Sequence, residues 1–86
     1  MEALIDAARA QGLSATTARQ LVLQTAWGAS QLAITSEDGP DVLRQRVTSP
    51  GGTTAAALRV FEEAGLREQV QAAVAAARER SEQLSG

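Results

Sequence analysis

Apolar residues recur along this chain every three or four positions, and no segment alternates regularly between apolar and polar residues. The first spacing gathers apolar side chains on one face of a helix, whereas a half-buried strand needs alternation. Gly12 and Gly65 are placed to end helices, and Ser14 is placed to cap the start of the longest one. The sequence therefore predicts an all-α domain of about five helices, over residues 3–11, 14–36, 40–47, 53–64 and 67–84.

The long helix predicted after Ser14 is apolar on more than one side. Its main apolar side consists of Ala18, Leu21, Val22, Thr25, Ala29, Leu32 and Ala33. Leu23, Trp27 and Ile34 lie on another side. Gly28 stands in the middle of this helix, where a glycine costs about 1 kcal/mol relative to alanine. A second helix that crosses closely at this point is the simplest explanation of the glycine.

The chain has few large side chains with which to cover these faces. Of its 38 apolar residues, 18 are alanine. The last predicted helix adds a narrow seam of mostly small residues, namely Val70, Ala73, Val74, Ala77, Ser81 and Leu84. A second subunit would bury more apolar surface than 86 residues can bury alone. We therefore expect an intertwined helical-bundle dimer; the alternative is a loosely packed monomeric bundle.

Composition excludes several classes of function. The chain has no cysteine, which excludes a disulfide framework and a thiolate zinc site, and no histidine, the usual proton shuttle; we expect no metal site. Its eight basic residues, all arginine, are outnumbered by ten acidic ones, so we expect no nucleic-acid binding. The longest uncharged run is interrupted by polar residues, and no basic segment precedes an apolar run at the start. We therefore expect no membrane span and no signal peptide, and a cytoplasmic location.

One segment, Thr48–Thr54 with the sequence TSPGGTT, could bind a ligand. Its proline and paired glycines favour a turn that opens directly into a helix, whose first N–H groups are unpaired and carry the positive end of the helix dipole. This arrangement favours an anion. The lysine of a phosphate-binding P-loop is missing, so a carboxylate is the more natural guest, although Arg44 and Arg46 are close in sequence. The alternative is that Thr53 or Thr54 merely caps the helix and that Pro50-Gly51-Gly52 is merely a turn.

From this segment onward, the sequence VTSPGGTTAAALRVFEEAGLREQVQAAVAAARERSEQL resembles the C-terminal dimerisation domain of pyrroline-5-carboxylate reductase, in which TSPGG[TA]T is a specific signature. The preceding residues agree: Gly-Leu at 12–13, ARQL at 18–21, QTAWGASQLAI at 24–34 and DVLRQRV at 41–47. The resemblance covers essentially residues 1–86. It implies a domain that forms a homodimer, with a decamer as a further assembly, in an enzyme that catalyses the last step of proline biosynthesis.

The resemblance also implies roles for the loop. Ser49 and the backbone N–H groups of Gly52, Thr53 and Thr54 would hold the carboxylate of pyrroline-5-carboxylate or proline. The Thr54 hydroxyl would face the ring nitrogen, as an orienting hydrogen-bond partner rather than a true acid. NADPH or NADH would bind a Rossmann domain of the full enzyme.

The chain departs from the full enzyme in one respect: its sequence contains no glycine-rich strand-turn-helix unit. We expect residues 1–86 to be the dimerisation and substrate-binding domain without its Rossmann domain, with no cofactor bound and no activity alone. Two other classes remain open. One is a purely structural dimerisation module without ligand, and the other is a helical adaptor for an unrelated protein, which would be monomeric with an exposed apolar face. A phosphate-binding enzyme is disfavoured, because no lysine or metal ligands accompany the loop.

Overall fold

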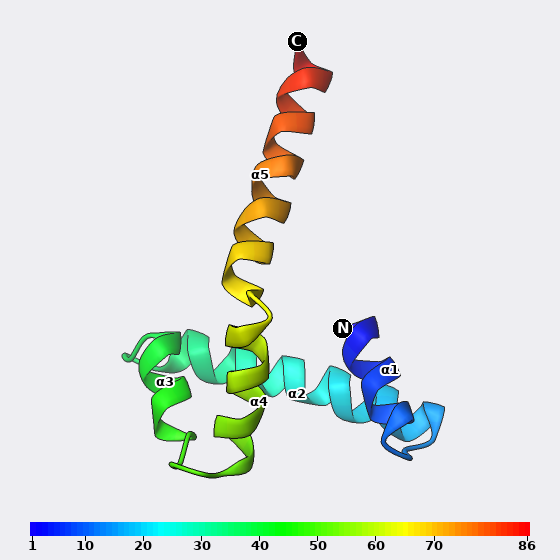
Figure 1. The fold of residues 1–86 in the computed structure, drawn as a ribbon, viewed down its shortest axis with the longest axis vertical. Helices are drawn as coiled ribbons and strands as arrows, with labels where there is room; N and C mark the ends of the chain where they lie inside the picture. The colour runs from blue at the N-terminus through cyan, green and yellow to red at the C-terminus, as the bar shows by residue number, and fades with distance from the viewer. The chain divides into compact units, whose positions relative to one another are not determined.

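The computed structural model describes all 86 residues and contains five α-helices and no strand (Figure 1). The helices are α1 (Glu2–Ala10), α2 (Ala15–Thr35), α3 (Pro40–Arg46), α4 (Thr53–Glu63) and α5 (Leu66–Ser85). The predicted all-α class and the order of the helices are confirmed, and no predicted helix end differs from the observed one by more than one residue. The chain divides into two compact units, residues 1–43 and 44–86, with the boundary inside α3.

In the first unit, a tight connection turns the chain from α1 into α2. Gly12 adopts a φ of +107°, and its N–H donates to the Arg9 carbonyl at 3.0 Å. The Leu13 N–H donates to the Ala8 carbonyl at 3.2 Å. This pair of bonds is a Schellman motif, which favours glycine at the left-handed position. Ser14 then caps α2 as predicted, because its Oγ accepts the Thr17 N–H at 3.2 Å.

Packing of α1 against α2 buries little. Ala18, on the first turns of α2, is the one buried residue of the whole chain. Around it, six side chains line a mostly apolar hollow between the two helices: Leu4, Ala8, Leu13, Leu21, Val22 and Thr25. Leu21 lines this hollow and is still 51% exposed, so α1 covers only part of the main apolar side of α2.

In the second unit, α5 follows α4 after a sharp break at Gly65. Gly65 adopts a φ of +79°, and its N–H donates to the Glu62 carbonyl at 3.2 Å. The predicted end of the fourth helix at this glycine is therefore confirmed. Arg67 Nε and Glu62 Oε1 lie 3.1 Å apart across the break, in an exposed ion pair that contributes little to stability.

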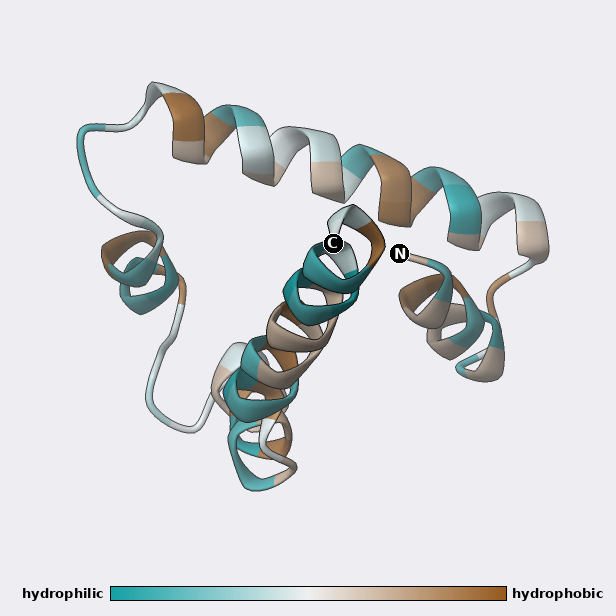
Figure 2. Cartoon of the chain, turned by 90° about the horizontal axis from the view of Figure 1, so that it is seen from above, coloured by the Kyte–Doolittle hydropathy of each residue, from teal (hydrophilic) through white to brown (hydrophobic).

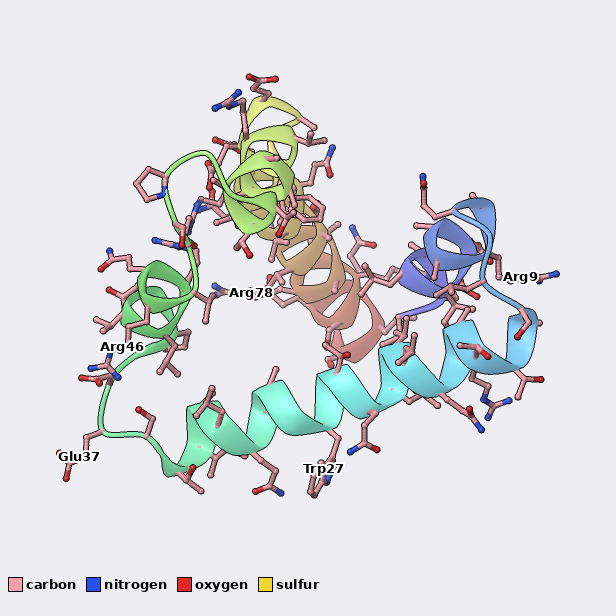
Figure 3. The ribbon with its side chains drawn as sticks, turned by 90° about the horizontal axis from the view of Figure 1, so that it is seen from below. Arg9, Trp27, Glu37, Arg46 and Arg78 are labelled. Atoms are coloured by element: carbon pink, nitrogen blue, oxygen red, sulfur yellow. The ribbon has the colours of Figure 1, made fainter.

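Large apolar side chains remain on the surface along several helices. Brown, apolar segments recur along α2 in Figure 2, and Figure 3 shows the Trp27 side chain extending away from that helix. Trp27 is 61% exposed and Ile34 77% exposed. A β-carbon added at Gly28 would meet nothing within 4 Å. No helix of the first unit therefore crosses at Gly28, and the crossing stays a prediction about a second subunit.

None of the five helices is long and apolar enough to cross a membrane.

Candidate functional site

The turn at Ser49–Gly52 leads directly into α4. The Gly52 N–H donates to the Ser49 carbonyl at 3.0 Å, with Pro50 and Gly51 as the two central residues. Gly51 has a φ of +74°. A proline in the second position and a glycine with positive φ in the third are the features of a type II turn. The predicted turn is confirmed, and Gly51 is the residue that needs a glycine's conformational freedom.

Gly52 is the residue that caps α4. Its backbone is extended, with φ −84° and ψ 178°, and no side chain bonds to the start of the helix. Thr53 and Thr54 are the first two residues of α4 rather than its cap. The alternative in which Thr53 or Thr54 serves as the helix cap is therefore wrong for this structure.

Three backbone N–H groups at the start of α4 have no hydrogen-bond partner in the chain: those of Thr53, Thr54 and Ala55. The Gly52 N–H, which the resemblance assigns to the substrate carboxylate, donates to the Ser49 carbonyl instead. The sequence motif gave no indication of the Ala55 N–H. Its availability follows from the rule that the first four N–H groups of a helix lack partners within it, once Gly52 is known to be the cap.

The hydroxyl-bearing residues of the loop differ in exposure. Ser49 and Thr53 are exposed, whereas Thr54 and Gly52 are partly buried. A β-carbon at Gly52 would lie 3.2 Å from the Ser49 carbonyl oxygen, so the turn leaves little room for a side chain there. Ser49, Gly52, Thr53 and Thr54 thus lie together around one turn and one helix start.

The two arginines close in sequence to the loop lie at the end of α3. Arg44 lines a hollow of about 450 Å³ along α4 and α5, together with Leu58, Phe61, Glu62, Leu66, Arg67, Val70 and Gln71. Its lining is largely apolar, with the Arg67–Glu62 ion pair at its edge. The start of α4 itself offers the positive end of the helix dipole and its first backbone N–H groups.

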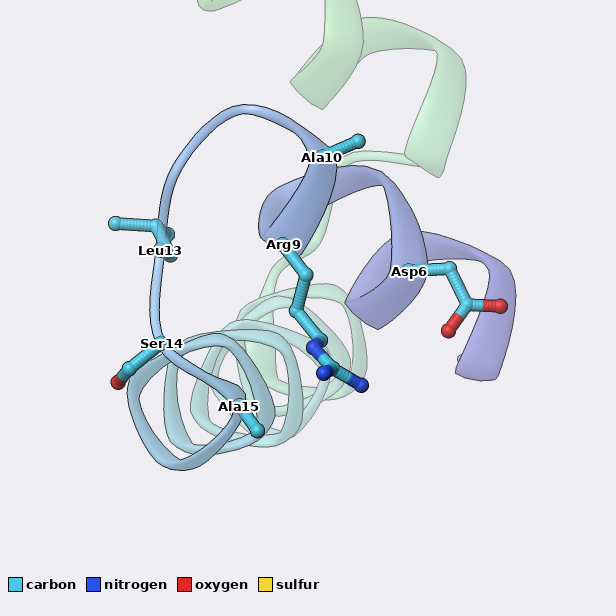
Figure 4. A pocket seen from close by; sticks show the side chains of 6 residues that line it. All are labelled: Asp6, Arg9, Ala10, Leu13, Ser14 and Ala15. Carbon is cyan, nitrogen blue, oxygen red and sulfur yellow. The ribbon is translucent and has the colours of Figure 1, made fainter.

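A more polar hollow lies in the first unit, near the start of α2. Its lining residues are Asp6, Arg9, Ala10, Leu13, Ser14 and Ala15, shown from close by in Figure 4. The Ser14 hydroxyl is already engaged as the α2 cap. Asp6 places a carboxylate beside the Arg9 guanidinium, so the hollow has no single sign of charge. The loop before α4 is the better candidate for an anion, and no cluster of metal-ligating side chains occurs in the chain.

Comparisons with known proteins agree on one family. The chain is 49% identical to the pyrroline-5-carboxylate reductase of Pseudomonas aeruginosa over 85 residues, which are 99% of this chain and 31% of that protein. It is 44% identical to the pyrroline-5-carboxylate reductase of Pisum sativum over 85 residues, again 99% of this chain and 31% of the relative. The chain therefore spans about a third of the length of the curated relatives that it matches.

A solved structure supports the fold. The crystal structure of Plasmodium falciparum pyrroline carboxylate reductase with NADP bound matches with a TM-score of 0.90 and 39% identity, covering 93% of this chain and 30% of that one. The family model described as pyrroline-5-carboxylate reductase dimerisation matches residues 1–84. With this match over nearly its whole length, the chain belongs to the pyrroline-5-carboxylate reductase dimerisation family.

Proposed function

We propose that this chain is the dimerisation and substrate-carboxylate-binding domain of an NAD(P)H-dependent pyrroline-5-carboxylate reductase. The observation that carries the substrate part is the start of α4, where the N–H groups of Thr53, Thr54 and Ala55 lack partners beside the signature turn. The relatives named above supply the reaction: each is a pyrroline carboxylate reductase.

A carboxylate fits this helix start better than a polyphosphate does. Three free backbone donors and the positive end of the α4 dipole suit one compact anion with a single charge. No lysine and no metal-ligating cluster is present to neutralise further charge. The Gly52 N–H would contribute only if the turn opened, so we assign the carboxylate to the amides of Thr53, Thr54 and Ala55 and to the Ser49 hydroxyl.

The Thr54 hydroxyl is assigned to the ring nitrogen of the substrate. Reduction adds a hydride to the carbon of the C=N bond and a proton to its nitrogen, so a hydroxyl beside that nitrogen orients the bond. Thr54 is partly buried at the second position of α4, next to the free amides. An unperturbed alcohol is a poor acid, and orientation is therefore the role that we propose.

The described residues offer no fit for the nicotinamide cofactor that the family implies. Dinucleotides bind at a glycine-rich turn between a strand and a helix, and this chain has no strand. We propose that NADPH or NADH, which supplies the hydride, binds another domain of the reductase. The residues of this chain then do no more than hold and orient the substrate.

Self-association is the second part of the proposal. The apolar side chains left exposed on α2, with Trp27 and Ile34 among them, would be covered by a second copy in a homodimer. The family model is itself described as a dimerisation domain. A purely structural module that has lost its ligand would share this dimer but not the carboxylate site.

Substitutions at the loop separate these two functions. This chain would replace the matching region of the Pseudomonas aeruginosa reductase, and the kinetics of the hybrid would be measured with and without each change. Thr54→Val keeps the shape of the side chain and removes its hydroxyl, so kcat should fall about ten- to a hundredfold if the hydroxyl addresses the nitrogen. Gly52→Val should raise KM strongly, because its side chain would crowd the Ser49 carbonyl and the free amides.

Thr16→Val is the matched control, since Thr16 is exposed at the start of α2 and belongs to the other unit. It should leave kcat and KM unchanged. Normal kinetics for both Thr54→Val and Gly52→Val, with the dimer intact, would reduce the loop to a turn and leave the structural module as the function.

A further inference from the structure

Thr48, the first residue of the signature, is the only loop residue whose side chain makes a hydrogen bond within the chain. Its Oγ1 donates to the Arg44 carbonyl at 2.6 Å, and its N–H donates to the Gln45 carbonyl at 3.2 Å. The Arg44 carbonyl also accepts the Val47 N–H at 3.3 Å. Thr48 is partly buried, whereas its neighbours Val47 and Ser49 are exposed. Thr48 therefore closes the end of α3 with both its backbone and its side chain.

The position of Thr48 matters because the turn begins at the next residue. The Ser49 carbonyl accepts the Gly52 N–H, and the Gly52 carbonyl accepts the Ala56 N–H at 3.1 Å. The far end of the turn is thus fixed to α4 by backbone bonds alone. At the near end, the Thr48 hydroxyl is the one side-chain anchor, at a distance typical of a strong O–H···O bond.

We infer that Thr48 is a positioning residue for the carboxylate site, an inference that rests on the proposed function. Its hydroxyl is engaged with Arg44 and does not touch the substrate. By fixing the backbone immediately before Ser49, it holds the Ser49 hydroxyl and the type II turn in place beside the free amides of Thr53 and Thr54. Without the anchor, the turn must be ordered when the carboxylate binds, and that ordering weakens binding.

The kinetic consequence differs from that of Thr54. Carboxylate contacts are made equally in the bound substrate and in the transition state, so weakening them raises KM and leaves kcat nearly unchanged. A residue that served only the stability of α3 would lower the melting temperature and leave the KM of the folded enzyme as it was. The split between KM and kcat therefore separates positioning from simple stabilisation.

The test compares Thr48→Val with Thr48→Ser in the same hybrid reductase. Valine keeps the shape of threonine without the hydroxyl, whereas serine keeps the hydroxyl. We expect Thr48→Val to raise the KM for pyrroline-5-carboxylate by about three- to tenfold, the effect of one hydrogen bond, with kcat within about twofold of the parent. Thr48→Ser should keep the parental KM for pyrroline-5-carboxylate, and the KM for the cofactor should be unchanged in both variants.

The 86-residue chain itself gives an independent readout. In ¹⁵N-labelled protein, Thr48→Val should shift the amide signals of Gly51, Gly52 and Thr53, and Thr48→Ser should not. L-Proline, added as the carboxylate probe, should then perturb the Thr53 and Thr54 amides less in the valine variant than in the serine variant.

Three results would overturn the inference: a parental KM in Thr48→Val, a raised KM in Thr48→Ser equal to that of valine, or a Thr48→Val protein that does not fold. If Thr48→Val does not fold, Thr48→Ala, which removes the methyl group as well, is tested next. Failure of both variants to fold would assign Thr48 to the fold. Thr54→Val distinguishes the two proposals. If it lowers kcat while Thr48→Val leaves KM unchanged, only this inference fails; if Thr54→Val and Gly52→Val are both normal, the proposed function fails and the inference fails with it.

Discussion

At the scale of single residues, the backbone of Gly51 decides the shape of the loop. Its φ of +74° lies in the left-handed region, which non-glycine residues enter only at a cost. Nothing lies within 4 Å of a β-carbon built there, so the cost of a side chain is conformational rather than steric. The turn that leads to the free amides of α4 therefore needs the left-handed conformation of Gly51.

Gly51→Ala should consequently destabilise the protein without any clash. A cost of about 1 kcal/mol would lower the Tm of a domain of this size by roughly 4–8 °C. Gly51→Asn is the matched control, because asparagine enters the left-handed region more readily than alanine does and should destabilise the protein less. Thermal melting of both variants at one protein concentration measures the difference. An alanine variant as stable as the parent would mean that the turn does not require this conformation.

At the scale of elements, local signals predicted most of what the structure contains. Gly12, Ser14 and Gly65 each act through hydrogen bonds to residues three to five positions away, so their effect can be predicted from a few letters of sequence. The residue that caps α4 was harder to predict from the sequence. Threonine and glycine are about equally good caps, so residue type alone did not decide between them. The turn closed by the Ser49 carbonyl places Gly52 at the cap and Thr53 in the helix. Ala55, as an amide donor, could be found only once this helix start was known.

The helix crossing predicted at Gly28 is not a local feature, because it would involve a helix of a second subunit. The surroundings of Gly28 are open in the structure, so alanine would fit there in a monomer. In a monomer, Gly28→Ala should also stabilise α2 by about 1 kcal/mol through helix propensity. The sign of its effect therefore reports whether a second helix crosses at this point.

We expect Gly28→Ala to weaken self-association, because a methyl group inserted into a close crossing costs about 1–3 kcal/mol and offsets the gain in propensity. Gly28→Leu should weaken association further. Sedimentation equilibrium of the parent and both variants gives the dissociation constants. A tighter or unchanged dimer, with a raised Tm, would remove Gly28 from the interface.

At the scale of the whole molecule, neither of the two compact units buries enough apolar surface to be stable by itself. One residue, Ala18, is buried, while Trp27, Ile34 and other large apolar side chains remain exposed. No core of this size offsets the conformational entropy of 86 ordered residues. A homodimer that covers these side chains is therefore the central claim, and it makes folding and association inseparable.

The melting temperature as a function of protein concentration, with the mass measured alongside by light scattering, tests that claim most directly. We predict a mass of twice 8.9 kDa and a Tm that rises with concentration, because association is linked to folding. A particle of 8.9 kDa that stays folded at nanomolar concentration, with a Tm independent of concentration, would contradict the account.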